Sequence, residues 1–105
     1  MSGPGAAPKR ICLLTADLLF RSKLGAVVAA AGGEVTRDDA GCDLAVIDLA
    51  DGARAGRVGE FVGRGIPVLA YGSHVRPEVL RAARDAGARA VPNSEVAAAL
   101  GDLLR

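Results

Sequence analysis

Short, mainly apolar segments alternate along this chain with longer stretches in which apolar residues recur at helical spacing. An apolar run that stops after four to six residues indicates a buried strand rather than a helix. The clearest example, Leu44 to Ile47, is closed by Asp48. The pattern predicts five strands, over 11–14, 34–36, 43–48, 66–71 and 89–92.

Helical spacing fills most of the stretches between these strands. The pattern predicts helices over about 18–31, 54–62, 77–86 and 95–104. Thr15 or Asp17 is suited to cap the first helix, and Ser94 the last. Pro77 fits the first turn of the third, because a proline there loses no helical hydrogen bond.

The second helix is expected to be weak. Within and beside it, Gly52, Gly56, Gly59 and Gly63 have spacings that would place them on one face of a helix. An interior glycine costs about 1 kcal/mol relative to alanine. Such a face could admit another backbone at close range. We expect instead a loose helix without a partner.

Alternation of strands and helices predicts an α/β fold in which helices cover both faces of a mainly parallel sheet. The interval 37–43 is the exception, since a parallel crossover ordinarily needs a dozen or more residues. A helix between the second and third strands is therefore expected to be missing. The second strand could be absent, displaced or part of an edge hairpin, and the path of 36–43 stays open.

Composition narrows the function classes. The chain has 105 residues, of which 50% are hydrophobic but only 3% aromatic, with a formal net charge of +1. We expect one domain over 9–105 behind a disordered tail, 1–8. A net charge near zero argues against a nucleic-acid-binding protein. Two cysteines do not make a disulfide framework, and no apolar stretch is long enough to span a membrane. A cytoplasmic protein is expected.

Asp48 is the leading candidate for a functional residue. An aspartate that closes a buried parallel strand lies at the carboxyl edge of the sheet, where α/β proteins bind ligands. Two interpretations stay open. Asp48 is either a working carboxylate, or a brace that hydrogen-bonds Thr15 or backbone N–H groups and holds the loops.

Three segments in this order resemble the receiver domain of bacterial response regulators: 43–49, 66–69 and 86–88. The resemblance covers about 9–105. It implies a flavodoxin-like three-layer fold with strand order 2-1-3-4-5. It also makes Asp48 the counterpart of the aspartate that accepts phosphate in that family.

The chain departs from the family at the positions that support this chemistry. Thr15 and Ala16 stand where the family has an acidic pair that holds magnesium, with Asp17 one place further on. Gly72 aligns with the switch serine or threonine, although Ser73 follows it and could substitute after a small shift. Asn93 and Ser94 stand where a lysine is expected. Without magnesium and lysine, little stabilises a transferring phosphoryl group.

These departures favour a pseudo-receiver that is not an enzyme and needs no cofactor. It would work as a protein–protein interaction module in bacterial signalling. A phosphorylatable receiver that uses Asp48 and magnesium is one alternative, and a small-ligand sensor at the carboxyl edge is another. Ser73 and His74 near Asp48 do not indicate a hydrolase, because adjacent residues on one loop rarely present a nucleophile to its base.

The expected partner is another signalling protein or a second copy of the chain. In receivers, the fourth helix, the last strand and the last helix carry output and dimerisation, so the resemblance makes the matching surface a candidate for an acidic partner. Tyr71 is either an exposed anchor for the partner or a buried core residue. The alternative to a docking surface is an arginine-rich surface that is simply solvated. The candidate contacts are Tyr71, His74, Arg76, Arg81, Arg84 and Arg89.

Overall fold

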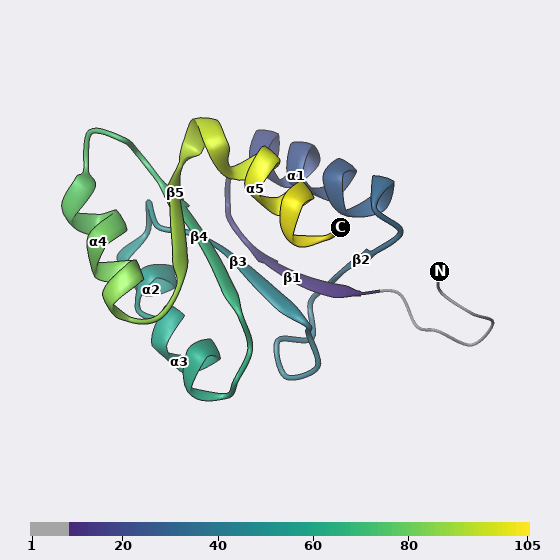
Figure 1. Cartoon of the computed structure of the whole chain (residues 1–105), viewed down its shortest axis with the longest axis horizontal. Coiled ribbons are helices and arrows are strands. Elements are labelled where there is room, and N and C mark those ends of the chain that lie inside the picture. Colours follow the sequence, from purple (N-terminus) through teal and green to yellow (C-terminus); the bar gives the residue numbers. More distant parts are fainter. Residues whose placement is uncertain (1–8) are drawn as a thin grey trace.

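The computed structural model describes residues 9–105; the predicted disordered tail, 1–8, lies outside this range. Five parallel strands form one sheet in the order β2-β1-β3-β4-β5, as predicted (Figure 1). The strands are β1 (Arg10–Leu14), β2 (Glu34–Thr36), β3 (Leu44–Asp48), β4 (Val68–Gly72) and β5 (Arg89–Pro92). The helices are α1 (Leu18–Ala30), α2 (Gly52–Ala55), α3 (Val58–Gly63), α4 (Pro77–Asp85), the 3₁₀ turn η1 (Asn93–Glu95) and α5 (Val96–Leu103).

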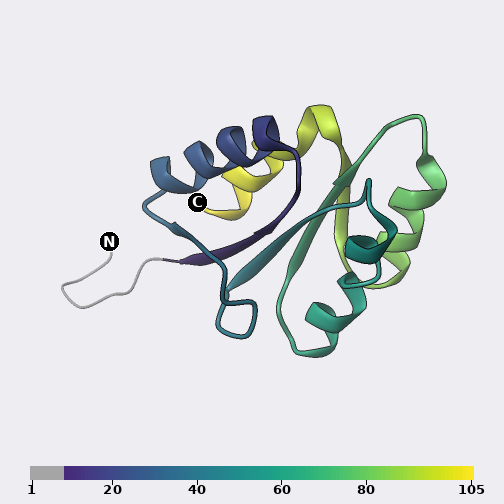
Figure 2. The same cartoon turned by 180° about the vertical axis from the view of Figure 1, so that it is seen from behind.

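Helices cover both faces of the sheet, which produces three layers. Helices α1 and α5 lie on one face, and α2, α3 and α4 lie on the other (Figures 1 and 2). Because neighbouring strand residues point to opposite faces, β1 gives Ile11 and Leu13 to the first core and Cys12 to the second. Cys12 and Cys42 are both buried as free thiols.

The predicted weak helix is present but broken. It forms two short helices, α2 and α3, with Asp51 capping the first and Gly56 ending it. A Cβ added at Gly52, Gly59 or Gly63 would meet no atom within 4 Å. No part of the described chain therefore uses the glycines as a close-approach face.

The connection between β2 and β3 contains no helix, as expected. Of the possibilities left open, β2 is a short edge strand that pairs in parallel with β1, and not a hairpin. Its pairing stops at Cys12 and Thr36, so Leu13 and Leu14 have no strand neighbour on that side of β1. Over residues 9–105, no helix is long and apolar enough to cross a membrane.

Candidate functional site

Asp48 closes β3 at the carboxyl edge of the sheet, and only 8% of it is exposed. Its carboxylate accepts a hydrogen bond from the Thr15 hydroxyl at 2.8 Å and another from the Ala50 backbone N–H at 2.9 Å. Thr15 is buried as well, and its oxygen accepts from the Asp17 N–H at 3.1 Å. Asp48 therefore ties the end of β1 to the loop that follows β3.

Asp17 is the other carboxylate near this edge, and it caps α1. Its side chain accepts from the backbone N–H groups of Leu19 and Phe20, at 2.9 and 3.1 Å. Of the two caps left open by the sequence, Asp17 and not Thr15 is thus the one used. Among residues 9–105, no group of three or more His, Cys, Asp or Glu side chains is placed to hold a metal ion.

A pocket of about 240 Å³ lies above Asp48. It brings together Asp17, Asp48, Gly72, Ser73 and Asn93, which the sequence marked as site-lining, whereas Thr15 and Ser94 are not on its wall. The basic residue on the wall is Arg76, whose guanidinium donates to Glu78 at 3.0 Å. The pocket thus has two carboxylates, those of Asp17 and Asp48, but no lysine among its lining residues.

Ser94 does not cap the last helix. Residues Asn93–Glu95 form the 3₁₀ turn η1, and α5 begins at Val96 without a side-chain cap. The cap prediction was wrong because Pro92 enters this segment in an extended conformation and the chain first closes a tighter turn. Phe20, which the sequence analysis missed, lines the pocket over Asp48; the Asp17 cap fixes its position in the first turn.

Tyr71 is a core residue, so its proposed role as an exposed anchor is wrong. Only 1% of it is exposed, and its ring lies 5.1 Å from that of Phe20. Burial raises the pKa of Tyr71 to about 12, and the charge of Asp48 adds to the rise. Its hydroxyl has no hydrogen-bond partner within 9–105. The alternation of β4 turns this side chain toward α1 and α5.

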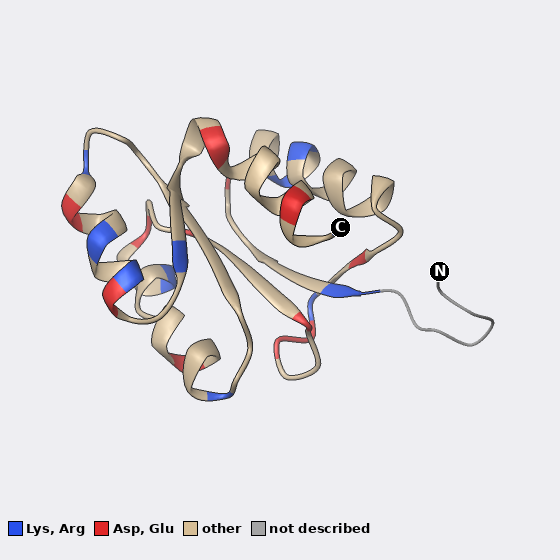
Figure 3. Ribbon diagram, viewed as in Figure 1, with Lys and Arg blue, Asp and Glu red and all other residues tan. Residues whose placement is uncertain are grey.

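The remaining candidate contacts are exposed. His74 and Arg76 lie in the loop after β4, Arg81 and Arg84 on α4, and Arg89 at the start of β5. Basic residues of α4 and β5 lie near one another in Figure 3. Arg84 is partly committed to the fold, because its guanidinium donates to the Ala90 carbonyl at 2.7 and 3.2 Å. Arg81 and Arg89 have no such bond among the described residues.

No family model and no curated protein matches the sequence. Several solved structures, however, are similar to this chain. The chain is similar to NtrX from Brucella abortus (TM-score 0.74, 16% identity), over 91% of its own length but 25% of that chain. It is also similar to HP1043, an orphan response regulator of H. pylori (TM-score 0.72, 16% identity, 92% of this chain and 97% of that one).

A third similar structure is the signal receiver domain of the putative response regulator NarL from Mycobacterium tuberculosis. The TM-score is 0.64 at 20% identity, over 94% of this chain and 98% of that one. Together these likenesses confirm the receiver-domain fold. The chain spans only a quarter of the NtrX chain it matches.

Proposed function

We propose that this chain is a non-catalytic receiver-like module that works in bacterial signalling by binding another protein or a second copy of itself. The observation that carries the proposal is the bonding of Asp48. The carboxylate that would accept phosphate is engaged by the Thr15 hydroxyl and the Ala50 N–H. A side chain that braces two loops in this way has a structural use that needs no phosphate.

The surroundings of Asp48 support the same conclusion. A hard divalent cation needs several oxygen ligands, and phosphoryl transfer needs positive charge beside the moving group. The pocket offers Asp48 and Asp17, of which the second caps α1. Arg76 is paired with Glu78 at its rim. We infer that Asp48 does not take part in phosphoryl transfer.

The proposed docking surface comprises α4 and β5, with Arg81 and Arg89 as its free cations. Both side chains are exposed and unpaired within the described range, so binding an acidic partner would cost no internal contact. Complementary charge of this kind speeds association and selects the partner. Arg84 is expected to contribute mainly by joining α4 to β5.

Incubation with acetyl phosphate and magnesium is expected to leave the mass of the intact protein unchanged. The physical reason is that neither a metal site nor a lysine stabilises the transferring group. Mass spectrometry of the wild type and of Asp48→Asn checks this result. A phosphate adduct on the wild type that is absent from Asp48→Asn would show a working receiver instead.

Reversal of the two free cations, in Arg81→Glu/Arg89→Glu, is expected to weaken binding of the partner at least tenfold, about 1.4 kcal/mol. Affinity capture from the native host's lysate identifies a hetero-partner, and light scattering after gel filtration detects self-association. Lys9→Glu/Lys23→Glu reverses two exposed lysines elsewhere and is the matched control. Equal binding by both double variants would place the partner on another surface.

A further inference from the structure

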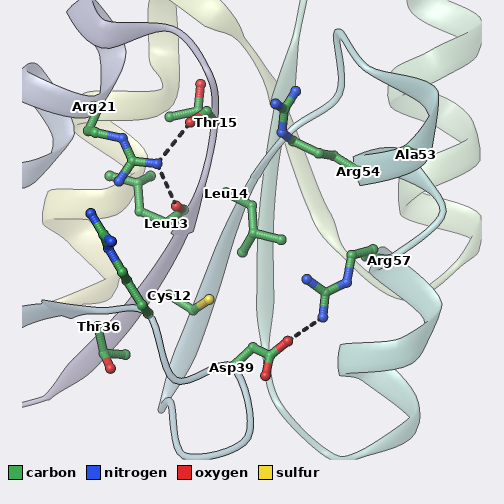
Figure 4. A pocket seen from close by; sticks show the side chains of 11 residues that line it. Cys12, Leu13, Leu14, Thr15, Arg21, Thr36, Asp39, Ala53, Arg54 and Arg57 are labelled. Carbon is green, nitrogen blue, oxygen red and sulfur yellow. Dashed lines mark hydrogen bonds and ion pairs between the residues drawn. The ribbon is translucent and has the colours of Figure 1, made fainter.

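A second pocket lies at the open edge of β1 (Figure 4), and its lining residues differ from those of the pocket over Asp48. It exists because β2 ends at Thr36, and no helix follows to cover this part of the sheet. Its volume is about 480 Å³, within the range of small-molecule sites. The lining residues most relevant to binding are Cys12, Leu14, Arg21, Arg37, Arg54 and Arg57.

Four arginines line this pocket against one carboxylate, that of Asp39. Arg57 hydrogen-bonds Asp39, which lowers the pKa of that carboxyl below its ordinary value and keeps it charged. Asp39 therefore offsets Arg57. Three further guanidinium groups, on Arg21, Arg37 and Arg54, remain to be considered.

Two of these three groups, Arg21 and Arg37, pair with no carboxylate in residues 9–105, whereas Arg54 forms an ion pair with Asp51. Arg21 donates to the Thr15 carbonyl at 2.9 Å, a bond to a neutral group that leaves its charge in place. Arg54 lies 3.5 Å from the carboxylate of Asp51. Arg37 makes no ion pair or side-chain hydrogen bond with any residue in 9–105. The pocket wall thus holds excess positive charge.

The segments that supply the arginines point to a ligand between them. Arg21 comes from α1 on one side of the β1 edge, and Arg54 and Arg57 lie on the opposite wall in Figure 4. Guanidinium groups on facing walls suit a compound with negative charge at more than one point, because each group can bind a phosphate or carboxylate through two N–H donors. Leu14 and Cys12 provide a small apolar floor.

We propose that this pocket binds a small polyanion, a compound that carries a phosphate ester or at least two carboxylates. Arg37 and Arg54 would contact the ligand directly, with Arg21 held in place by the β1 carbonyl. Thr36 adds a hydroxyl that already accepts from Arg10 and from the Asp38 N–H and can donate its proton to the anion. No residue of α4 or β5 lines this pocket, which lies toward the opposite edge of the sheet from β5, so its ligand would bind independently of that surface.

Isothermal titration calorimetry with pyrophosphate and with citrate, at constant ionic strength, tests the proposal. Saturable binding of at least one of them is expected, with a Kd of about 1 mM or lower. Arg37→Gln/Arg54→Gln is expected to raise that Kd at least tenfold. These two side chains make no bond that joins elements of the fold, so the variant is expected to unfold at the same urea concentration as the wild type.

Arg81→Gln/Arg89→Gln removes the same number of charges outside the pocket and is expected to keep the wild-type Kd. Preference for pyrophosphate or for citrate assigns the phosphate or the carboxylate class. No saturable heat with either compound up to roughly 10 mM, tenfold above the expected Kd, would overturn the proposal. An equal loss of affinity in the two double variants would also overturn it, because binding would then follow net charge and not this pocket.

Discussion

Raising the pH above about 9 is expected to destabilise the protein steeply. The reason is that two buried side chains, Cys12 and Tyr71, have higher pKa values in the folded than in the unfolded chain. Burial raises the pKa of Cys12 from 9.0 to about 11, and the neighbouring Cys42 and Asp39 add to the rise. Burial raises the pKa of Tyr71 from 10.0 to about 12. Both groups are therefore held in their neutral forms.

The direction of the pH effect follows from linkage between ionisation and folding. Each group contributes its full amount to the free energy of unfolding below the pKa that it has in the unfolded chain. This contribution is lost as the pH rises through the pKa that it has in the folded protein. The window runs from about 9 to about 11 for Cys12 and from about 10 to about 12 for Tyr71. Each pKa rise corresponds to a little under ~3 kcal/mol, so the total loss is roughly 5–6 kcal/mol.

Urea unfolding followed by circular dichroism at a series of pH values measures the loss. Tyr71 is the only tyrosine, so ultraviolet absorbance of its phenolate reports its pKa directly. Tyr71→Phe is expected to abolish the upper part of the loss and to be no less stable at neutral pH, since it removes a buried hydroxyl without a partner in the described chain. Titration of the folded protein near 10 would contradict the buried position of Tyr71.

Phe61→Ala is expected to lower the free energy of unfolding by about 3–5 kcal/mol. Phe61 is fully buried and packs in the core between the sheet and α3. The guanidinium groups of Arg57 and Arg64 lie 5.1 and 4.8 Å from its ring centroid, and each such contact adds a fraction of a kcal/mol or more. A small domain has only about 5–15 kcal/mol in total, so the variant would be close to unfolding.

Phe20→Ala is the matched control for the loss of a phenyl ring. Phe20 is only half-buried, and it packs against the core on the α1 and α5 side of the sheet, with its ring centroid 5.1 Å from that of Tyr71. We expect it to cost roughly half as much as Phe61→Ala, since less apolar surface returns to water. Urea unfolding of both variants measures the difference. Equal losses would mean that α3 packs less closely on the sheet than described.

The three central strands, β1, β3 and β4, could be predicted from this sequence because each is buried on both faces. Runs such as Leu44 to Ile47 leave no polar position at which a helix could meet solvent. The missing helix was also predictable, since 37–43 is too short to hold one. The break between α2 and α3 was not predicted, because several glycines in one segment weaken a helix without specifying where it ends.

The candidate site was only partly predictable. The position of Asp48 follows from its place after a buried strand, and Asp17 precedes an apolar helical run as a cap does. The bond from Thr15 to Asp48 joins residues 33 apart, and the sequence left it as one of two possibilities. The sequence did not decide whether Tyr71 is buried or exposed. Both faces of β4 are covered by helices, so the exposure of this side chain depended on how α1 and α5 pack.

The sequence by itself determined the parallel α/β fold and, through the receiver resemblance, the strand order, because these depend on local pattern and residue type. Only the tertiary structure decided that Asp48 accepts hydrogen bonds from Thr15 and Ala50, that Tyr71 is internal, and that arginines from α1, α2 and the loop after β2 share one pocket. Residues this far apart in the sequence meet only when the sheet has formed, and the short β2 leaves the edge of β1 open between them.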